Sequence, residues 1–76
     1  MTHITEMLQT HPKASTVDLQ SMRECIDACY DCAQSCNSCA DACLAESGVQ
    51  ELVRCIRLNI DCAEICATTG NIMARL

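Results

Sequence analysis

The chain has 76 residues, nine of which are cysteine, and a formal net charge of −5 at pH 7. A chain this short forms one small domain and, below roughly 70–80 residues, usually needs a metal, disulfides or a partner chain for stability. The acidic balance argues against a nucleic-acid partner, and no apolar run approaches the ~18 residues of a membrane span.

The N-terminal segment, residues 1–14, shows no sustained hydrophobic period and contains the only proline, Pro12. We expect a mobile arm here, with a short helical turn around residues 4–8. The run STVD at residues 15–18 has the form of a capping box, in which a serine side chain satisfies the first free amides of a helix. The first long helix is therefore predicted over about residues 17–46, a stretch without glycine or proline.

Ser47 and Gly48 interrupt this helical pattern. We expect Gly48 to take the left-handed position that commonly ends a helix, and Ser47 with Gln50 to cap the next one. A second helix follows over about residues 49–74. Because a two-residue link between long helices gives an antiparallel pair, the sequence predicts an all-α helical hairpin. A single bent helix is the alternative.

The cysteines repeat with the period of a helix. On the first helix they are spaced 4, 3, 4, 3 and 4 residues apart, which is the a/d register that holds leucine and isoleucine in a coiled coil. Sulfur therefore forms the inward stripe of each helix. Apolar packing beside it is expected from Leu52, Ile56, Leu58, Ile65 and Ile72. The stripe consists of Cys25, Cys29, Cys32, Cys36, Cys39 and Cys43 on the first helix and Cys55, Cys62 and Cys66 on the second.

Several roles are conceivable for these thiols. Cysteine can act as a small hydrophobe, but six in consecutive register carry a redox liability that alanine lacks. A disulfide-stabilised bundle is opposed by the odd count, by the missing secretory signal and by the strain of bridging neighbours on one helix. An iron–sulfur cluster needs about four thiolates that converge, and a linear array offers no such focus.

A thiol redox protein is the remaining alternative. Cys29 and Cys32, like Cys36 and Cys39, have the C-x-x-C spacing of disulfide oxidoreductases. Those motifs usually lie at a helix N-terminus, which lowers the thiol pKa, whereas these lie within a helix. No nucleophile–base pair or phosphate-binding loop is recognisable, and we do not expect an enzyme.

A store of soft metal ions accounts for the whole array, and charge favours copper(I). A four-thiolate zinc site keeps a charge of about −2, which is costly to repeat along a helical core. Copper(I) carries one positive charge and is satisfied by two or three soft thiolates. At one copper(I) per thiol each ion replaces one proton, so thiolates that bridge neighbouring ions can fill the core while it stays near neutral. We expect pairs four residues apart to hold single ions: Cys25/Cys29, Cys32/Cys36, Cys39/Cys43 and Cys62/Cys66.

Five further residues are minor candidates. Met22 and Met73 continue the stripe at its end, where they are either copper(I) ligands or core filler. His3 and His11 on the arm are either solvated or points of copper uptake. Tyr30, the only aromatic residue, is expected to pack at a helix contact.

The runs CIDACYDCAQSCNSCADACLAES and RCIRLNIDCAEICATTGNIM closely resemble the bacterial copper storage proteins, four-helix bundles with cysteine-lined cores. The resemblance covers residues 22–73 and rests on a six-cysteine ladder followed by C-x6-C-x3-C. It implies that all nine cysteines bind copper(I), several ions per chain, and thereby protect against copper toxicity. It also implies a cytoplasmic protein, because the exported branch carries a twin-arginine signal that we do not find here. A copper chaperone or a small thiol is the expected donor.

Members of that family continue past the position of Leu76 into two further cysteine-bearing helices. We therefore expect this hairpin to be half of a four-helix bundle, completed by a partner chain or by sequence beyond the one given. In the first case the partner is a second copy, in an antiparallel homodimer or a higher homo-oligomer, because an isolated hairpin would expose its thiols to water and oxidation.

Overall fold

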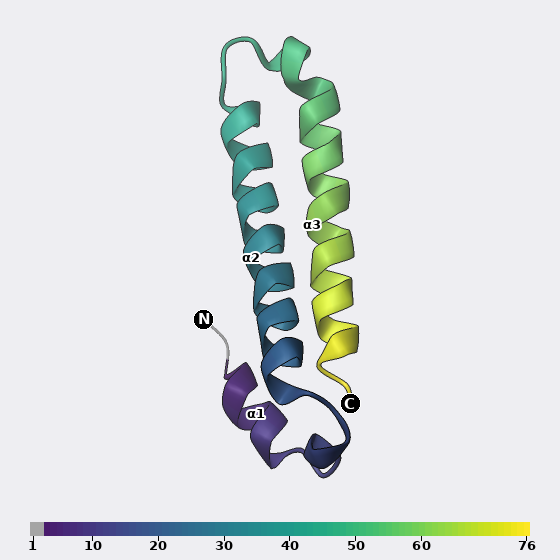
Figure 1. The fold of residues 1–76 in the computed structure, drawn as a ribbon. Helices are drawn as coiled ribbons and strands as arrows, with labels where there is room; N and C mark the ends of the chain where they lie inside the picture. The colour runs from purple at the N-terminus through teal and green to yellow at the C-terminus, as the bar shows by residue number, and fades with distance from the viewer. Residues whose placement is uncertain (1–2) are drawn as a thin grey trace.

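The computed structural model describes residues 3–76, which form an elongated molecule of 51 × 17 × 14 Å (Figure 1). Helices α2 and α3 lie antiparallel along most of their length, and the described residues contain no strand, so the predicted all-α hairpin is confirmed. The α-helices are α1 (Ile4–Thr10), α2 (Leu19–Leu44) and α3 (Val53–Met73), and two short 3-10 segments cover Ala14–Thr16 and Val49–Leu52.

Helix α2 begins at Leu19, and Asp18 is its N-cap. The Asp18 carboxylate accepts hydrogen bonds from the backbone amides of Gln20 (3.1 Å) and Ser21 (3.3 Å) and from the Ser21 hydroxyl (3.0 Å). The Ser21 amide and hydroxyl, followed by the Gln20 amide, hold the pKa of the Asp18 carboxyl below its usual value. The predicted cap at Ser15 is wrong, because Ser15 lies in the 3-10 turn that precedes α2.

The tip of the hairpin differs from the prediction in two ways. Gly48 has φ −93° and ψ 35°, and no residue from 3 to 76 has a positive φ, so the predicted left-handed glycine is wrong. The predicted cap by Ser47 and Gln50 is wrong as well, because residues 49–52 wind as a 3-10 helix whose N-cap is Gly48. The α-helix begins only at Val53. The link is longer than two residues, so the chain reverses without a left-handed position.

The contact between α2 and α3 is made by the residues that directly follow cysteines. Ile26 and Ala40 on α2, and Ile56 and Ala63 on α3, are buried. Gly70 continues this α3 stripe, and a Cβ atom placed there would lie 3.2 Å from the Tyr30 ring, which confirms that Tyr30 packs at the helix contact. Because alanine and glycine occupy most of these positions, the two helices approach closely.

Three large apolar residues of α3 do not pack within the hairpin. Leu58, Ile65 and Ile72 are 57%, 65% and 55% exposed, whereas Ile56 is buried. Of the five residues expected to supply apolar packing, Ile56 is therefore buried and Leu52, in the 3-10 segment before α3, is half-buried. The other three form an aliphatic stripe that no described part of the chain covers.

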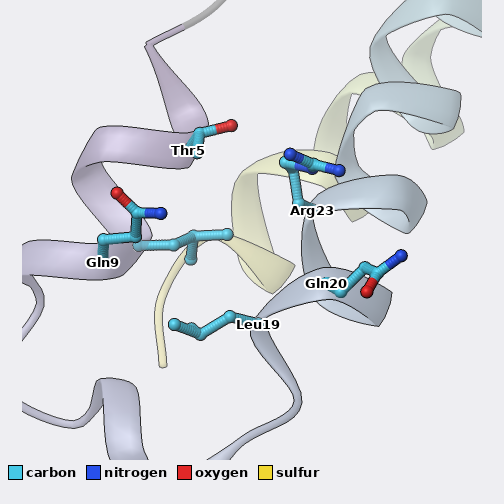
Figure 2. Close-up of a pocket in the computed structure, with 6 residues that line it drawn as sticks. Thr5, Gln9, Leu19, Gln20 and Arg23 are labelled. Carbon is cyan, nitrogen blue, oxygen red and sulfur yellow. The ribbon is translucent and has the colours of Figure 1, made fainter.

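Helix α1 folds back against the start of α2 (Figure 1). Leu8 is buried there, next to a hollow of about 250 Å³ between the two helices (Figure 2). The helical turn expected around residues 4–8 is thus present and extends to Thr10, whereas the mobility of the arm stays a prediction and residues 1–2 lie outside the described residues. No cysteine lines the hollow, whose walls are Thr5, Leu8, Gln9, Leu19, Gln20 and Arg23.

Candidate metal centre

The nine cysteines form one stripe along the hairpin, which we call the thiol face. All nine are free thiols. Each helix turns about 100° per residue, so the cysteines that precede Ile26, Ala40, Ile56 and Ala63 lie beside the α2–α3 contact rather than inside it. Three thiols are exposed and six are half-buried, because the hairpin covers the face on one side only. The exposed thiols are those of Cys25, Cys39 and Cys55.

The middle of this face holds four sulfur atoms in close proximity, the central thiol cluster of Cys32, Cys36, Cys62 and Cys66. Sγ of Cys32 lies 3.7 Å from Sγ of Cys62 across the two helices. Within each helix the Sγ atoms of Cys32 and Cys36, and those of Cys62 and Cys66, are 3.9 Å apart. The sulfurs of Cys32, Cys36 and Cys62 all lie within 4.8 Å of one another, which suits one metal ion held by both helices.

Hydrogen bonds between these thiols make their pKa values unequal. The pKa of Cys32 is lowered because the thiols of Cys66, Cys62 and Cys36 donate to its sulfur. The contact with Cys62, followed by burial, raises the pKa of Cys36 to about 12. The contact with Cys32, followed by burial, raises the pKa of Cys66 to about 12. Of these three thiols, that of Cys32 therefore loses its proton most readily.

The rates of alkylation should reveal which of these three thiols ionises most readily. In the reduced apoprotein at pH 8, we expect iodoacetamide to modify Cys32 about tenfold or more faster than Cys36 or Cys66, because only the thiolate is nucleophilic. Peptide mapping by mass spectrometry at short reaction times measures the three rates in one sample. All three thiols are half-buried, so accessibility is matched. Equal rates, or modification of Cys36 first, would contradict the assignment.

One end of the thiol face combines a thiol with a thioether. Sγ of Cys25 donates to Sδ of Met73 at 3.3 Å, so the structure brings the predicted candidate Met73 to the cysteine stripe. Cys29 lies in the same region, and its pKa is raised first by burial and then by the nearby Cys25 thiol. Met22 is half-buried one turn before Cys25.

The other end of the face, near the hairpin tip, gathers three thiols. Burial, followed by the neighbouring Cys39 and then Cys55, raises the pKa of Cys43. Sγ of Cys55 also accepts a hydrogen bond from Nδ2 of Asn59 at 3.7 Å. The thiol face therefore extends from the tip to the open end of the hairpin, with its tightest sulfur cluster at the middle.

The two histidines lie apart from this arrangement. His3 is exposed at the N-cap of α1. Nδ1 of His11 accepts a hydrogen bond from the backbone amide of Lys13 at 3.0 Å, which holds its ring within its own turn. The structure thus unites the cysteines and Met73, whereas the histidines belong to the α1 region.

Comparison with known proteins places this geometry in a family. The copper storage protein family matches residues 18–76, which include α2, the tip and α3. The chain belongs to the copper storage protein family. No curated protein matches it. Within residues 3–76, no helix has both the length and the apolar character needed to cross a bilayer.

Membership of the copper storage family agrees with the chemistry of the donors. The matched region contains all nine cysteines, while α1 and both histidines lie outside it. Thiolate is a soft ligand that suits copper(I). Two structural features were not evident from the cysteine spacing: the cross-helix pair Cys32/Cys62 and the contact of Cys25 with Met73. Both depend on the position of α3 along its axis relative to α2.

Proposed function

We propose that the protein stores several copper(I) ions per chain on its thiol face and so protects the cell against copper toxicity. The observation that carries this proposal is the central thiol cluster, in which three sulfurs from two helices lie within 4.8 Å of one another. Copper(I) is satisfied by two or three such ligands, so this cluster can accept an ion without reorganisation of the helices.

Charge supports copper(I) over zinc at this place. The chain carries a net charge of −5, with only five lysine and arginine residues to offset further anions. One copper(I) that replaces one thiol proton leaves the local charge unchanged, whereas zinc in a four-thiolate site leaves about −2. Repeating the zinc site along the hairpin would add to an already acidic protein, so copper(I) fills the array at lower electrostatic cost.

All nine cysteines are ligands in this proposal, and the ions load in an order set by geometry. The central cluster binds first, because its sulfurs already converge. The thiols at the tip and at the open end follow, and Met73 adds a thioether beside Cys25. The protein acts in the cytoplasm, receives copper from a chaperone or a small thiol, and requires two further helices to cover the thiol face.

Anaerobic titration with copper(I) tests the function. The reduced protein is titrated in the presence of a chromophoric copper(I) chelator, and the amount of copper withheld from the chelator is measured. Storage predicts that several ions per chain are withheld before the chelator responds. The same protein with all thiols alkylated is the control and should withhold none. One ion or none per unmodified chain would exclude storage and would favour the thiol redox alternative.

The apparent affinity should rise with pH. Cys36 and Cys66, with pKa values of about 12, and Cys29 and Cys43, whose pKa values are raised, are protonated at neutral pH, so copper must displace their protons. Between pH 6 and pH 8 we expect the affinity to increase by about tenfold per pH unit for each proton released per ion. Competition titrations at three pH values, corrected for the chelator's own protonation, measure the slope. A flat profile would show that protons are not displaced.

A further inference from the structure

The open end of the hairpin holds a cross-helix contact built around the only aromatic side chain of the chain. The Tyr30 hydroxyl on α2 donates a hydrogen bond to Oδ1 of Asn71 on α3 at 2.5 Å. The ring of Tyr30 lies over Gly70, where an added Cβ atom would come within 3.2 Å of two ring carbons and within 3.3 Å of Cβ of Cys29. Tyr30, Gly70 and Asn71 thus form one contact between the helices, which we call the tyrosine clamp.

The direction of the tyrosine side chain explains how it reaches α3. Side chains of an α-helix tilt toward its N-terminus, and the N-terminus of α2 lies at the open end beside the C-terminus of α3 (Figure 1). The Tyr30 ring therefore leans toward the open end and meets the last turn of α3. Glycine at position 70 leaves room for the ring, because ordinary contacts between carbon atoms are about 3.5–4.0 Å long and a Cβ there would be closer.

The tyrosine clamp borders the sulfur atoms at the open end on both helices. On α2, Tyr30 directly follows Cys29. On α3, Met73 follows Asn71 by two residues, about 3 Å along the helix axis, and its Sδ lies 3.3 Å from Sγ of Cys25. Met73 is also the last residue of α3, and the ends of helices fray unless other contacts hold them. The contact between Met73 and Cys25 therefore requires that the last turn of α3 stays in place.

The clamp and the sulfurs lie on opposite sides of the contact between the helices. A helix turns about 100° per residue, so Tyr30 lies about 140° around α2 from Cys25. On α3, Met73 lies about 60° to one side of the buried Gly70, and Asn71 lies about 100° to the other. The clamp thus joins the helices at this end without taking the place of a copper ligand.

We propose that Tyr30 is a positioning residue for copper(I) storage. Through Gly70 and Asn71 it holds the last turn of α3 where Met73 and Cys25 form a preorganised site for one ion. A preorganised pair of sulfurs binds an ion more tightly, because less side-chain and backbone freedom is lost on binding. This inference rests on the proposed function, since it concerns the open end of the copper-binding thiol face.

A double-mutant cycle tests the proposal. Tyr30→Phe keeps the ring over Gly70 and removes the hydroxyl, and Asn71→Leu removes the acceptor. We expect each to lower the affinity for the ion bound by Met73 about two- to tenfold, as the loss of one hydrogen bond predicts. The double variant should lose little more than either single variant, because both remove the same bond. Asn37→Leu makes the same kind of change at an exposed position near the middle of α2, and it is the matched control.

NMR of the full chain labelled with carbon-13 on its methionine methyl groups provides a readout specific to the open end. The Met73 resonance, assigned with Met73→Leu, should shift when its sulfur binds an ion. Anaerobic titration at free copper(I) concentrations buffered by a chelator then gives the affinity of that ion. Copper bound at the central thiol cluster, and the helix content by far-UV circular dichroism, should be the same in all variants. A purely structural defect would change both.

The outcomes separate this inference from the storage function. A Met73 resonance that copper(I) does not shift in the wild type would overturn the inference alone. The same follows if the resonance shifts at equal free copper(I) in the wild type and in both single variants. Because Asn71 is exposed, Asn71→Leu keeps the test decisive even if Tyr30→Phe unfolds the chain. A wild-type chain that withholds no copper(I) from the chelator would overturn the storage function and this inference with it.

Discussion

Replacing the four residues of the central thiol cluster with serine is expected to remove the tightest-bound copper and to lower the copper capacity per chain by about half. Four of nine thiols are lost, and serine oxygen is a poor ligand for a soft monovalent ion. The affinity for the first ion should fall by on the order of tenfold or more, because the remaining thiols must move together before they can share an ion. Competition titration with a copper(I) chelator measures the capacity and the first affinity in one experiment.

A matched variant separates position from number. Replacing Cys25, Cys39, Cys43 and Cys55 with serine also removes four thiols but leaves the central thiol cluster intact. We expect a similar loss of capacity, with a first affinity close to that of the wild type. If the affinity for the first copper ion falls equally in both quadruple variants, all the thiols contribute alike and the central thiol cluster has no special role.

The cysteine spacing alone was enough to predict the helices and the stripe of sulfur, because alternating steps of three and four residues are typical of one face of a helix. It could not predict which flank of the stripe contacts the neighbouring helix. On α2 each flank carries alanines among larger residues, so Ala33 and Ala40 on one flank are as suitable for a close contact as Ala28 and Ala42 on the other. The side chains of α3 decide the matter. Ala63 and Gly70 allow close approach to α2, whereas the bulkier Ile65 and Ile72 are left for another surface.

The central thiol cluster was only half predictable for a related reason. Residues four apart on one helix are always neighbours, so the pair Cys32/Cys36 follows from sequence. The pair Cys32/Cys62 depends on the height of α3 relative to α2, which the tip determines. The sequence suggested a two-residue link with a left-handed Gly48, whereas the chain uses a longer turn and a 3-10 segment over residues 49–52. Capping patterns in the sequence do not distinguish a short link from a longer one. The position of α3 along α2 could therefore not be predicted.

Replacing Ile26 with alanine is expected to have the largest effect on folding. Ile26 is 0% exposed and is the largest fully buried side chain of the described residues. Truncating a buried isoleucine costs about 2–5 kcal/mol. The whole stability of a domain of this size is about 4–11 kcal/mol, at roughly 0.05–0.15 kcal/mol per residue. We therefore expect the melting temperature of the reduced apoprotein to fall by roughly 8–40 °C, at about 4–8 °C per kcal/mol.

Copper should reverse much of this loss, because ions held between α2 and α3 bind the folded hairpin and not the separated helices. Binding to the folded state alone adds about 2.7 kcal/mol when free ligand is at roughly 100 times its dissociation constant. Thermal melts followed by far-UV circular dichroism, at one protein concentration with and without copper(I), measure both effects. Ile60→Ala is the control: Ile60 is 43% exposed, and its loss should shift the melt only slightly.

Each outcome of these melts bears on a different part of the structure. An Ile26→Ala protein that melts like the wild type would show that the helix contact lies elsewhere. One that copper fails to stabilise would show that the metal does not bridge the two helices. Cys32 lies about two turns along α2 from Ile26, so the substitution leaves its sulfur and that of Cys62 free to join α2 to α3 through a shared ion.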